Sequence, residues 1–197
     1  MEQNYQSRDV WSRTVSVHGY PIDELRSVLQ KSIRRGRIEE AALAAYEFFA
    51  SGAETEEVLW RRLEIIAAED VGLGMAAAPA IVNALYLQAG RMADPGDRWI
   101  YCAHAVRLLA TAKKDNMSNE LAGWTKEVVA RGARRVEVED FMVDMHTRRG
   151  AESGRDAAHW WNEGAKLENR IEGYDPKWGD YLRGLAGAKV DGTPDAK

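Results

Sequence analysis

The chain has 197 residues, of which 45% are hydrophobic and 29% charged, with a net charge of −4; these values are typical of one globular domain, or of one domain with an appendage. No apolar run approaches the roughly 20 residues of a membrane span, and no basic start followed by an apolar segment is present, so we expect a cytoplasmic protein without membrane contact. The single cysteine, Cys102, excludes an internal disulfide, and the negative net charge argues against a surface that binds nucleic acid throughout.

The chain begins with a polar, mixed stretch, and we expect residues 1–20 to form an arm that docks weakly or is disordered. Pro21 suits the first turn of a helix. Apolar residues then recur at helical spacing and predict a helix over residues 22–35, which Gly36 ends. Basic residues fill its last turn, where the helix dipole favours them; they are Lys31, Arg34 and Arg35.

The same period predicts further helices along the chain. Leu121, Trp124, Thr125 and Val128 share one face of the last of them. The expected helices cover residues 38–51, 55–71 and 79–88, then a segment from a cap at Asp97 to the basic turn Lys113-Lys114, and a segment from a cap at Asn116 or Ser118 to Gly132.

No run of alternating β-branched residues occurs, which predicts an all-α fold. Beyond Val136 the apolar pattern becomes shorter and more broken. We therefore expect an N-terminal arm, a helical domain, a helical C-terminal appendage and a disordered tail, over residues 1–20, 21–135, 136–184 and 185–197.

The stretch from Leu59 to Leu73 combines a helical apolar stripe with two acids in its last turn, Glu69 and Asp70. Acids at that end oppose the helix dipole, which predicts a cationic partner. The nearest candidate cations in the sequence are Arg34 and Arg35, at the end of an earlier helix. We expect an ion pair between these two helix ends; the alternative is two solvated faces that never touch.

Three ordered motifs carry a resemblance to a known family. They are Lys31 to Gly36 followed by an alanine-rich helix, Arg61-Arg62 with Glu69 to Leu73, and Leu109 to Asn116. Together they resemble the C-terminal helical region of the replication-associated recombination protein A (RarA/MgsA) family of AAA+ ATPases. The third motif is similar to the family's LATAPKSN turn, with Lys113 in place of proline and Asp115 in place of serine. The resemblance covers about Leu25 to Val129, and we expect Asp140 to Asn169 to depart from the family.

The resemblance implies an orthogonal helical bundle of the clamp-loader collar type, a region that assembles ATPase subunits into a tetramer. No Gly-x-x-x-x-Gly-Lys-Ser/Thr loop occurs in these residues, so we expect no ATP hydrolysis, no enzymatic activity and no cofactor. We expect a homo-oligomer, a tetramer or a dimer, linked to DNA replication or repair, with a full-length AAA+ ATPase as a further partner. Trp60 and Trp124 are candidate interface anchors, and the alternative for each is an ordinary core position.

A second interpretation is a DNA-binding adaptor that uses basic helix ends to hold phosphates. Solvated helix caps are the simpler explanation for such charges. The candidate contacts for DNA or a protein partner are Lys31, Arg61, Arg62, Lys113, Lys114 and Asn116.

A third interpretation is a small metal-dependent enzyme. Asp144 and His146 lie near an expected helix end, and His159 and Glu163 would share a helix face. A metal site needs three or four converging ligands, and the spacing gives only two weak pairs. We therefore prefer helix capping for these side chains and expect no metal.

Overall fold

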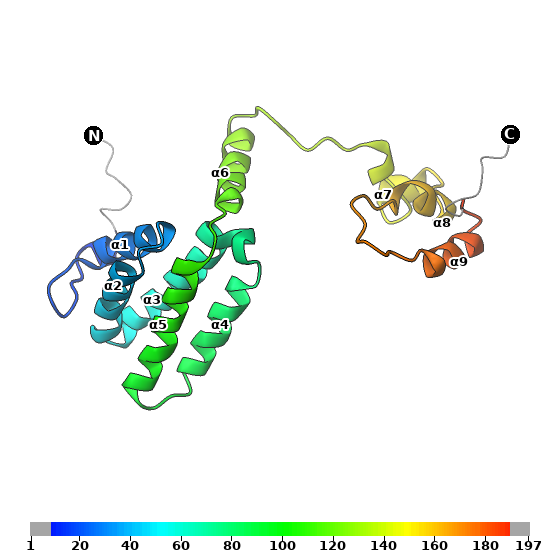
Figure 1. Ribbon diagram of the computed structural model, residues 1–197. Coiled ribbons are helices and arrows are strands. Elements are labelled where there is room, and N and C mark those ends of the chain that lie inside the picture. Colours follow the sequence, from blue (N-terminus) through cyan, green and yellow to red (C-terminus); the bar gives the residue numbers. More distant parts are fainter. Residues whose placement is uncertain (1–8, 190–197) are drawn as a thin grey trace. The chain divides into compact units, whose positions relative to one another are not determined.

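The computed structural model describes residues 9–189, and this part of the chain consists of helices and loops (Figure 1). Within the described residues the pairing of extended backbone is limited to an isolated bridge between Val15 and Pro21. The prediction of an all-α fold is therefore confirmed. No helix among residues 9–189 combines the length and the apolar composition needed to cross a bilayer.

The chain divides into two compact units, residues 1–131 and 132–197. The boundary expected from the sequence, after residue 135, falls in the loop that follows the last helix of the first unit. The longer helices of the first unit are α1 (Ile22–Arg34), α2 (Ile38–Ala50), α3 (Ala53–Ile66), α4 (Ala78–Ala89), α5 (Pro95–Thr111) and α6 (Met117–Ala130).

The helices from α1 to α5 together enclose the core of the first unit. Helix α1 packs mainly on α2, and α5 packs on both α2 and α4. Ile22, Leu29 and Ile33 follow the helical period along α1 and are fully buried, as the amphipathic pattern predicts. Cys102 of α5 is also buried in this core, and burial raises the pKa of its thiol to about 12.

Several predicted helix ends differ from the observed ones. Pro21 precedes α1 as its N-cap. Asp94 caps α5, because its side chain accepts a hydrogen bond from the backbone N–H of Asp97, so the prediction that Asp97 is the cap is wrong. The helix expected to reach residue 71 ends as an α-helix at Ile66 and continues as a π-helical turn, η3 (Ala67–Val71).

Residues 9–20 of the expected arm lie against the first unit. They include a short 3₁₀ turn, η2 (Val10–Ser12), and Trp11 packs partly buried against the core. The Asp9 carboxylate forms an ion pair with Arg26 of α1, and Ser51 accepts a hydrogen bond from the backbone N–H of Val17. Residues 1–8 lie outside the described part of the chain.

The second unit is built from short elements. Arg155 donates hydrogen bonds to the carboxylate and the backbone oxygen of Asp140 and to the backbone oxygen of Val143. The elements are η5 (Asp140–Met142), α7 (Arg148–Glu152), α8 (Ala157–His159), a π-helical turn η6 (Trp160–Gly164) and α9 (Lys177–Leu185).

The tail expected from residue 185 starts at the end of α9. The backbone N–H of Lys189 donates a hydrogen bond to Asn162 Oδ1 of η6. Residues 190–197 fall outside the described part of the chain.

Candidate interaction site

The C-terminal end of α1 meets the π-helical turn η3 through charged side chains. Arg34 Nε lies 2.5 Å from Asp70 Oδ1, and Arg34 Nη2 lies 3.5 Å from Glu69 Oε1. Asp70 is 1% exposed, whereas the Arg34 side chain is 44% exposed. The structure thus brings Arg34 to both acids. Arg35 is exposed just after α1, and the described residues give it no ion pair.

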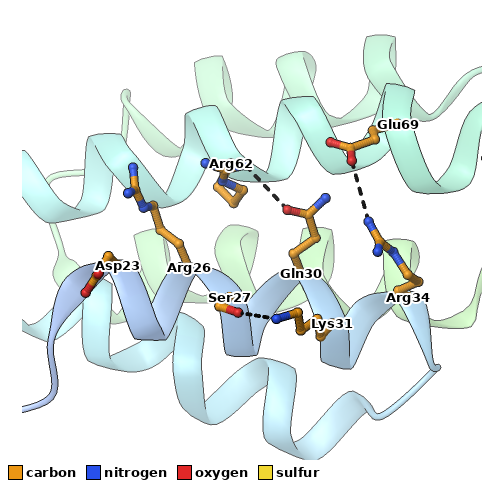
Figure 2. A pocket seen from close by; sticks show the side chains of 8 residues that line it. All are labelled: Asp23, Arg26, Ser27, Gln30, Lys31, Arg34, Arg62 and Glu69. Atoms are coloured by element: carbon orange, nitrogen blue, oxygen red, sulfur yellow. Dashed lines mark hydrogen bonds and ion pairs between the residues drawn. The ribbon is translucent and has the colours of Figure 1, made fainter. Parts of the chain in front are cut away.

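A neutral side chain completes this network, which we call the α1–η3 junction (Arg34, Gln30, Arg62, Glu69 and Asp70). Gln30 donates from Nε2 to Asp70 Oδ2 over 2.9 Å, and Arg62 of α3 donates to Gln30 Oε1 over 3.4 Å. Burial, and then the nearby positive charge of Arg26, lower the pKa of Arg62 from its usual value. Figure 2 shows Gln30 between Arg62 and Arg34 on the facing helices.

A cleft of about 380 Å³ lies beside this junction (Figure 2). Two of the four cations that line it form ion pairs: Arg34 pairs with Glu69 and Asp70, and Arg26 pairs with Asp9. The other two, Lys31 and Arg62, donate to Ser27 and Gln30. Ion pairs thus compensate two of these four charges, and the acids Asp23 and Glu69 also line the cleft, so it suits a structural network better than a phosphate-binding surface. The cleft is lined by Asp23, Arg26, Ser27, Gln30, Lys31, Arg34, Arg62 and Glu69.

The glycines after η3 pack against the turn that follows α5. Gly72 has φ +49°, and a Cβ atom there would lie 2.6 Å from the backbone oxygen of Asp115; a Cβ atom on Gly74 would lie 2.3 Å from that of Lys113. Only glycine allows both approaches. The backbone N–H of Asp115 also donates to the backbone oxygen of Asp70 over 3.0 Å. Two of the motifs singled out in the sequence are therefore in direct contact.

Asp115 links this contact to the start of α6. Its carboxylate accepts hydrogen bonds from the backbone N–H groups of Leu73 and Met117, each over 3.0 Å. Asn116, expected as a cap, precedes α6 without a side-chain capping bond, and its Oδ1 is buried without a partner among the described residues. The side chain at position 115 therefore performs the capping role.

The structure uses several of the candidate DNA-binding cations internally. Lys114 Nζ donates to the backbone oxygens of Leu109, Ala110 and Ala112 at the end of α5, and burial lowers its pKa. Arg61 pairs with Glu57 on the same helix, and Lys31 Nζ donates to Ser27. Lys113 is exposed. Lys31 and Arg62 line one cleft, Arg61 and Arg62 line a neighbouring one, and Lys114 caps the end of α5.

The two candidate interface tryptophans have different environments. Trp60 is 2% exposed and packs edge-to-face on Tyr86, with ring centroids 5.6 Å apart. The prediction that Trp60 anchors an interface is thus corrected to a core position. Trp124 of α6 is 48% exposed.

Helix α6 buries none of its residues. One line along it is nevertheless apolar, because residues spaced by four, three and four positions share a helix face. Met117 is 71% exposed and Leu121 61%. We call this line, which consists of Met117, Leu121, Trp124 and Val128, the α6 stripe.

A groove lies next to the first turn of α6. It has a volume of about 410 Å³ and runs between that turn and the end of α3. Ile65, half exposed, supplies an apolar side chain to it. The lining residues are Glu64, Ile65, Ala68, Glu69, Ser118 and Asn119.

The proposed metal cluster in the second unit does not assemble. His146 Nδ1 lies 3.3 Å from Asp144 Oδ1, but Glu163 pairs with Lys166. The backbone N–H of His159 donates to Asp156, which caps α8. Among residues 9–189 no three His, Cys, Asp or Glu side chains gather in a way that could hold a metal ion. The metal-dependent enzyme has no site in this part of the chain.

A comparison with known families places the chain. The sequence model described as "MgsA AAA+ ATPase C terminal" matches residues 38–174, and no curated protein matches the chain. The match includes Asp140 to Asn169, so the expectation that this segment departs from the family is wrong. Because the matched range covers well over half of the sequence, the chain belongs to the family of MgsA AAA+ ATPase C-terminal domains.

Proposed function

We propose that this chain is a non-catalytic assembly module that joins copies of itself through the α6 stripe. The observation that carries the proposal is the exposure of Met117, Leu121 and Trp124 on one line of a helix with no buried residue. Exposed apolar surface that is continuous, rather than scattered, is typical of a protein interface.

The length of α6 supports the same interpretation. An isolated helix of 14 residues is only marginally stable in water, since most helical stability in proteins comes from packing one face. Asp115 holds the first turn of α6, and along its apolar line Met117 and Leu121 remain exposed while Val128 is half-buried. Packing this line on a second copy would bury Leu121 and Trp124 and stabilise the helix.

A symmetric arrangement fits a surface of this kind. In a two-fold interface each copy presents the same patch, so the α6 stripe of one chain would lie against that of the other. The groove beside Ile65 would then receive side chains from the partner's helix. This contact closes a dimer, so the tetramer implied by the resemblance to collar regions would need a second, different surface on each chain.

Membership of the family suggests the context of this activity. We propose that the chain, as a member of this family, brings motor subunits together in DNA replication or repair, with an AAA+ ATPase as its partner. The compensated charges of the α1–η3 junction give less support to a DNA-binding adaptor.

The test is the mass of the particle in solution, measured by light scattering over a range of micromolar concentrations. The unmodified chain should give a multiple of 22.1 kDa, and Leu121→Glu should give the single-chain mass. Lys126→Glu is the matched control, because it places the same new side chain on the opposite face of α6 and should keep the assembly. Unchanged circular dichroism in both variants separates loss of assembly from unfolding. A monomeric unmodified chain, or an assembled Leu121→Glu variant, would refute the proposal.

A further inference from the structure

The second unit contains a cavity of about 260 Å³ between η6 and α9. This volume is slightly below the roughly 300–1,000 Å³ of ordinary small-molecule sites. The cavity lies entirely within the second unit, away from every residue invoked in the assembly proposal. Its chemically distinctive lining residues are Trp160, Trp161, Arg170, Tyr174, Asp180 and Arg183.

Aromatic rings form much of the wall. Trp160 and Trp161 are in edge contact, with ring centroids 4.6 Å apart and an interplanar angle of 61°. The Arg170 guanidinium lies 5.0 Å from the centre of the Tyr174 ring, and that of Arg183 lies 5.5 Å from the Trp161 ring. Rings arranged in this way offer flat faces on which another planar group can stack.

A buried acceptor also lines the cavity. Asp180 Oδ1 is buried and receives no hydrogen bond from the described residues. A buried carboxylate oxygen without a donor is costly, and such atoms in native proteins are usually satisfied by water or by a ligand. A ligand that matches this cavity therefore brings an N–H or O–H donor to Asp180.

We propose that this cavity binds a nucleobase that carries a phosphate, either in a free nucleotide or in an unpaired nucleotide of a single strand. The base stacks on one of the two tryptophan rings, which lie at 61° to each other, and donates from its Watson–Crick edge to Asp180. The guanidinium groups of Arg170 and Arg183 attract the phosphate. The aromatic walls and the carboxylate alone would also suit a simple cation, but the two guanidinium groups repel one.

The proposal is tested by isothermal titration calorimetry on the full chain. The probes are GMP, guanosine, a mixed-sequence single-stranded DNA oligonucleotide and the same oligonucleotide as a duplex. GMP should bind more tightly than guanosine because it adds the phosphate contact, and the duplex should not bind because its bases are stacked and paired. Binding of GMP identifies a nucleotide site, and binding of the single strand alone identifies a strand site; both outcomes support the proposal.

Two variants that each remove one negative charge test whether Asp180 binds the base. Asp180→Asn should weaken binding about tenfold, since it replaces the charged acceptor. Glu168→Gln removes an exposed carboxylate outside the cavity and should bind like the unmodified chain. Circular dichroism and the thermal midpoint establish that both variants fold. Equal binding by Asp180→Asn and the unmodified chain would overturn the proposal, as would no heat from any probe, or binding of an acidic aromatic peptide when the nucleotide probes fail.

Discussion

The carboxylate of Asp70 accepts hydrogen bonds from Arg34 and Gln30 while its side chain is fully buried. Removing one partner of a buried pair leaves the other donors without an acceptor. We therefore expect Asp70→Ala to lower the free energy of unfolding by about 2 kcal/mol, less than a wholly buried pair would lose because Arg34 is partly solvated. Urea denaturation followed by circular dichroism measures the change.

The control for this prediction is an ion pair in solvent. Arg61 pairs with Glu57 four residues earlier on α3, and the Arg61 side chain is 72% exposed. Arg61→Ala should change the free energy of unfolding by less than about 0.5 kcal/mol. If Asp70→Ala shifts the urea midpoint no more than Arg61→Ala does, the α1–η3 junction does not contribute to stability.

At the scale of residues, the charged members of the α1–η3 junction could be predicted from the sequence, but the neutral Gln30 between them could not. The dipole argument pointed to a cation beside Glu69 and Asp70, and the structure places Arg34 there. Gln30 was missed because an amide has no charge to be unbalanced at a helix end; its position one turn before Arg34 was the available signal. Both alternatives stayed open for Trp60 because spacing along one helix does not show whether another helix covers that face.

At the scale of elements, the close approach of η4 (Gly72–Met75) to the turn after α5 determines where α6 begins. Gly74→Ala would place a methyl group 2.3 Å from the backbone oxygen of Lys113, and backbone cannot rotate away as a side chain can. We expect this variant to lose about 1–3 kcal/mol of unfolding free energy, as other overpacked sites do. Thermal denaturation followed by circular dichroism measures it.

The matched control is Gly123→Ala, in the middle of α6. A Cβ atom there meets nothing within 4 Å, and alanine favours the helix over glycine by about 0.5–1 kcal/mol. Gly123→Ala should therefore raise the melting temperature while Gly74→Ala lowers it. If Gly74→Ala is as stable as the unmodified chain, the contact between the two motifs is looser than the structure describes.

Helices were predictable where burial and periodicity coincide, as in α1, α2 and α4. The π-helical turn η3 was not, since the extra residue per turn leaves no mark in the pattern of apolar positions. The pattern of α6 was read correctly as helical, but an apolar stripe is identical whether it faces a core or another chain. Only the placement of α6 beyond the end of α5 separates these alternatives (Figure 1).

At the scale of the whole molecule, the apolar core belongs to one unit. Among the described residues, Val143 is the one buried hydrophobic residue outside residues 1–131. The second unit is instead held by polar contacts such as those of Arg155 and by its aromatic cluster. A unit with so little buried apolar area should be the less stable of the two.

We expect thermal unfolding of the full chain, followed by calorimetry, to show two transitions, with the second unit unfolding at the lower temperature. Arg155→Ala removes the donor to Asp140 and Val143 and should lower only the first transition. Asp70→Ala should lower only the second. Because each variant acts as the control for the other, a single transition that both variants shift together would show that the two units unfold as one.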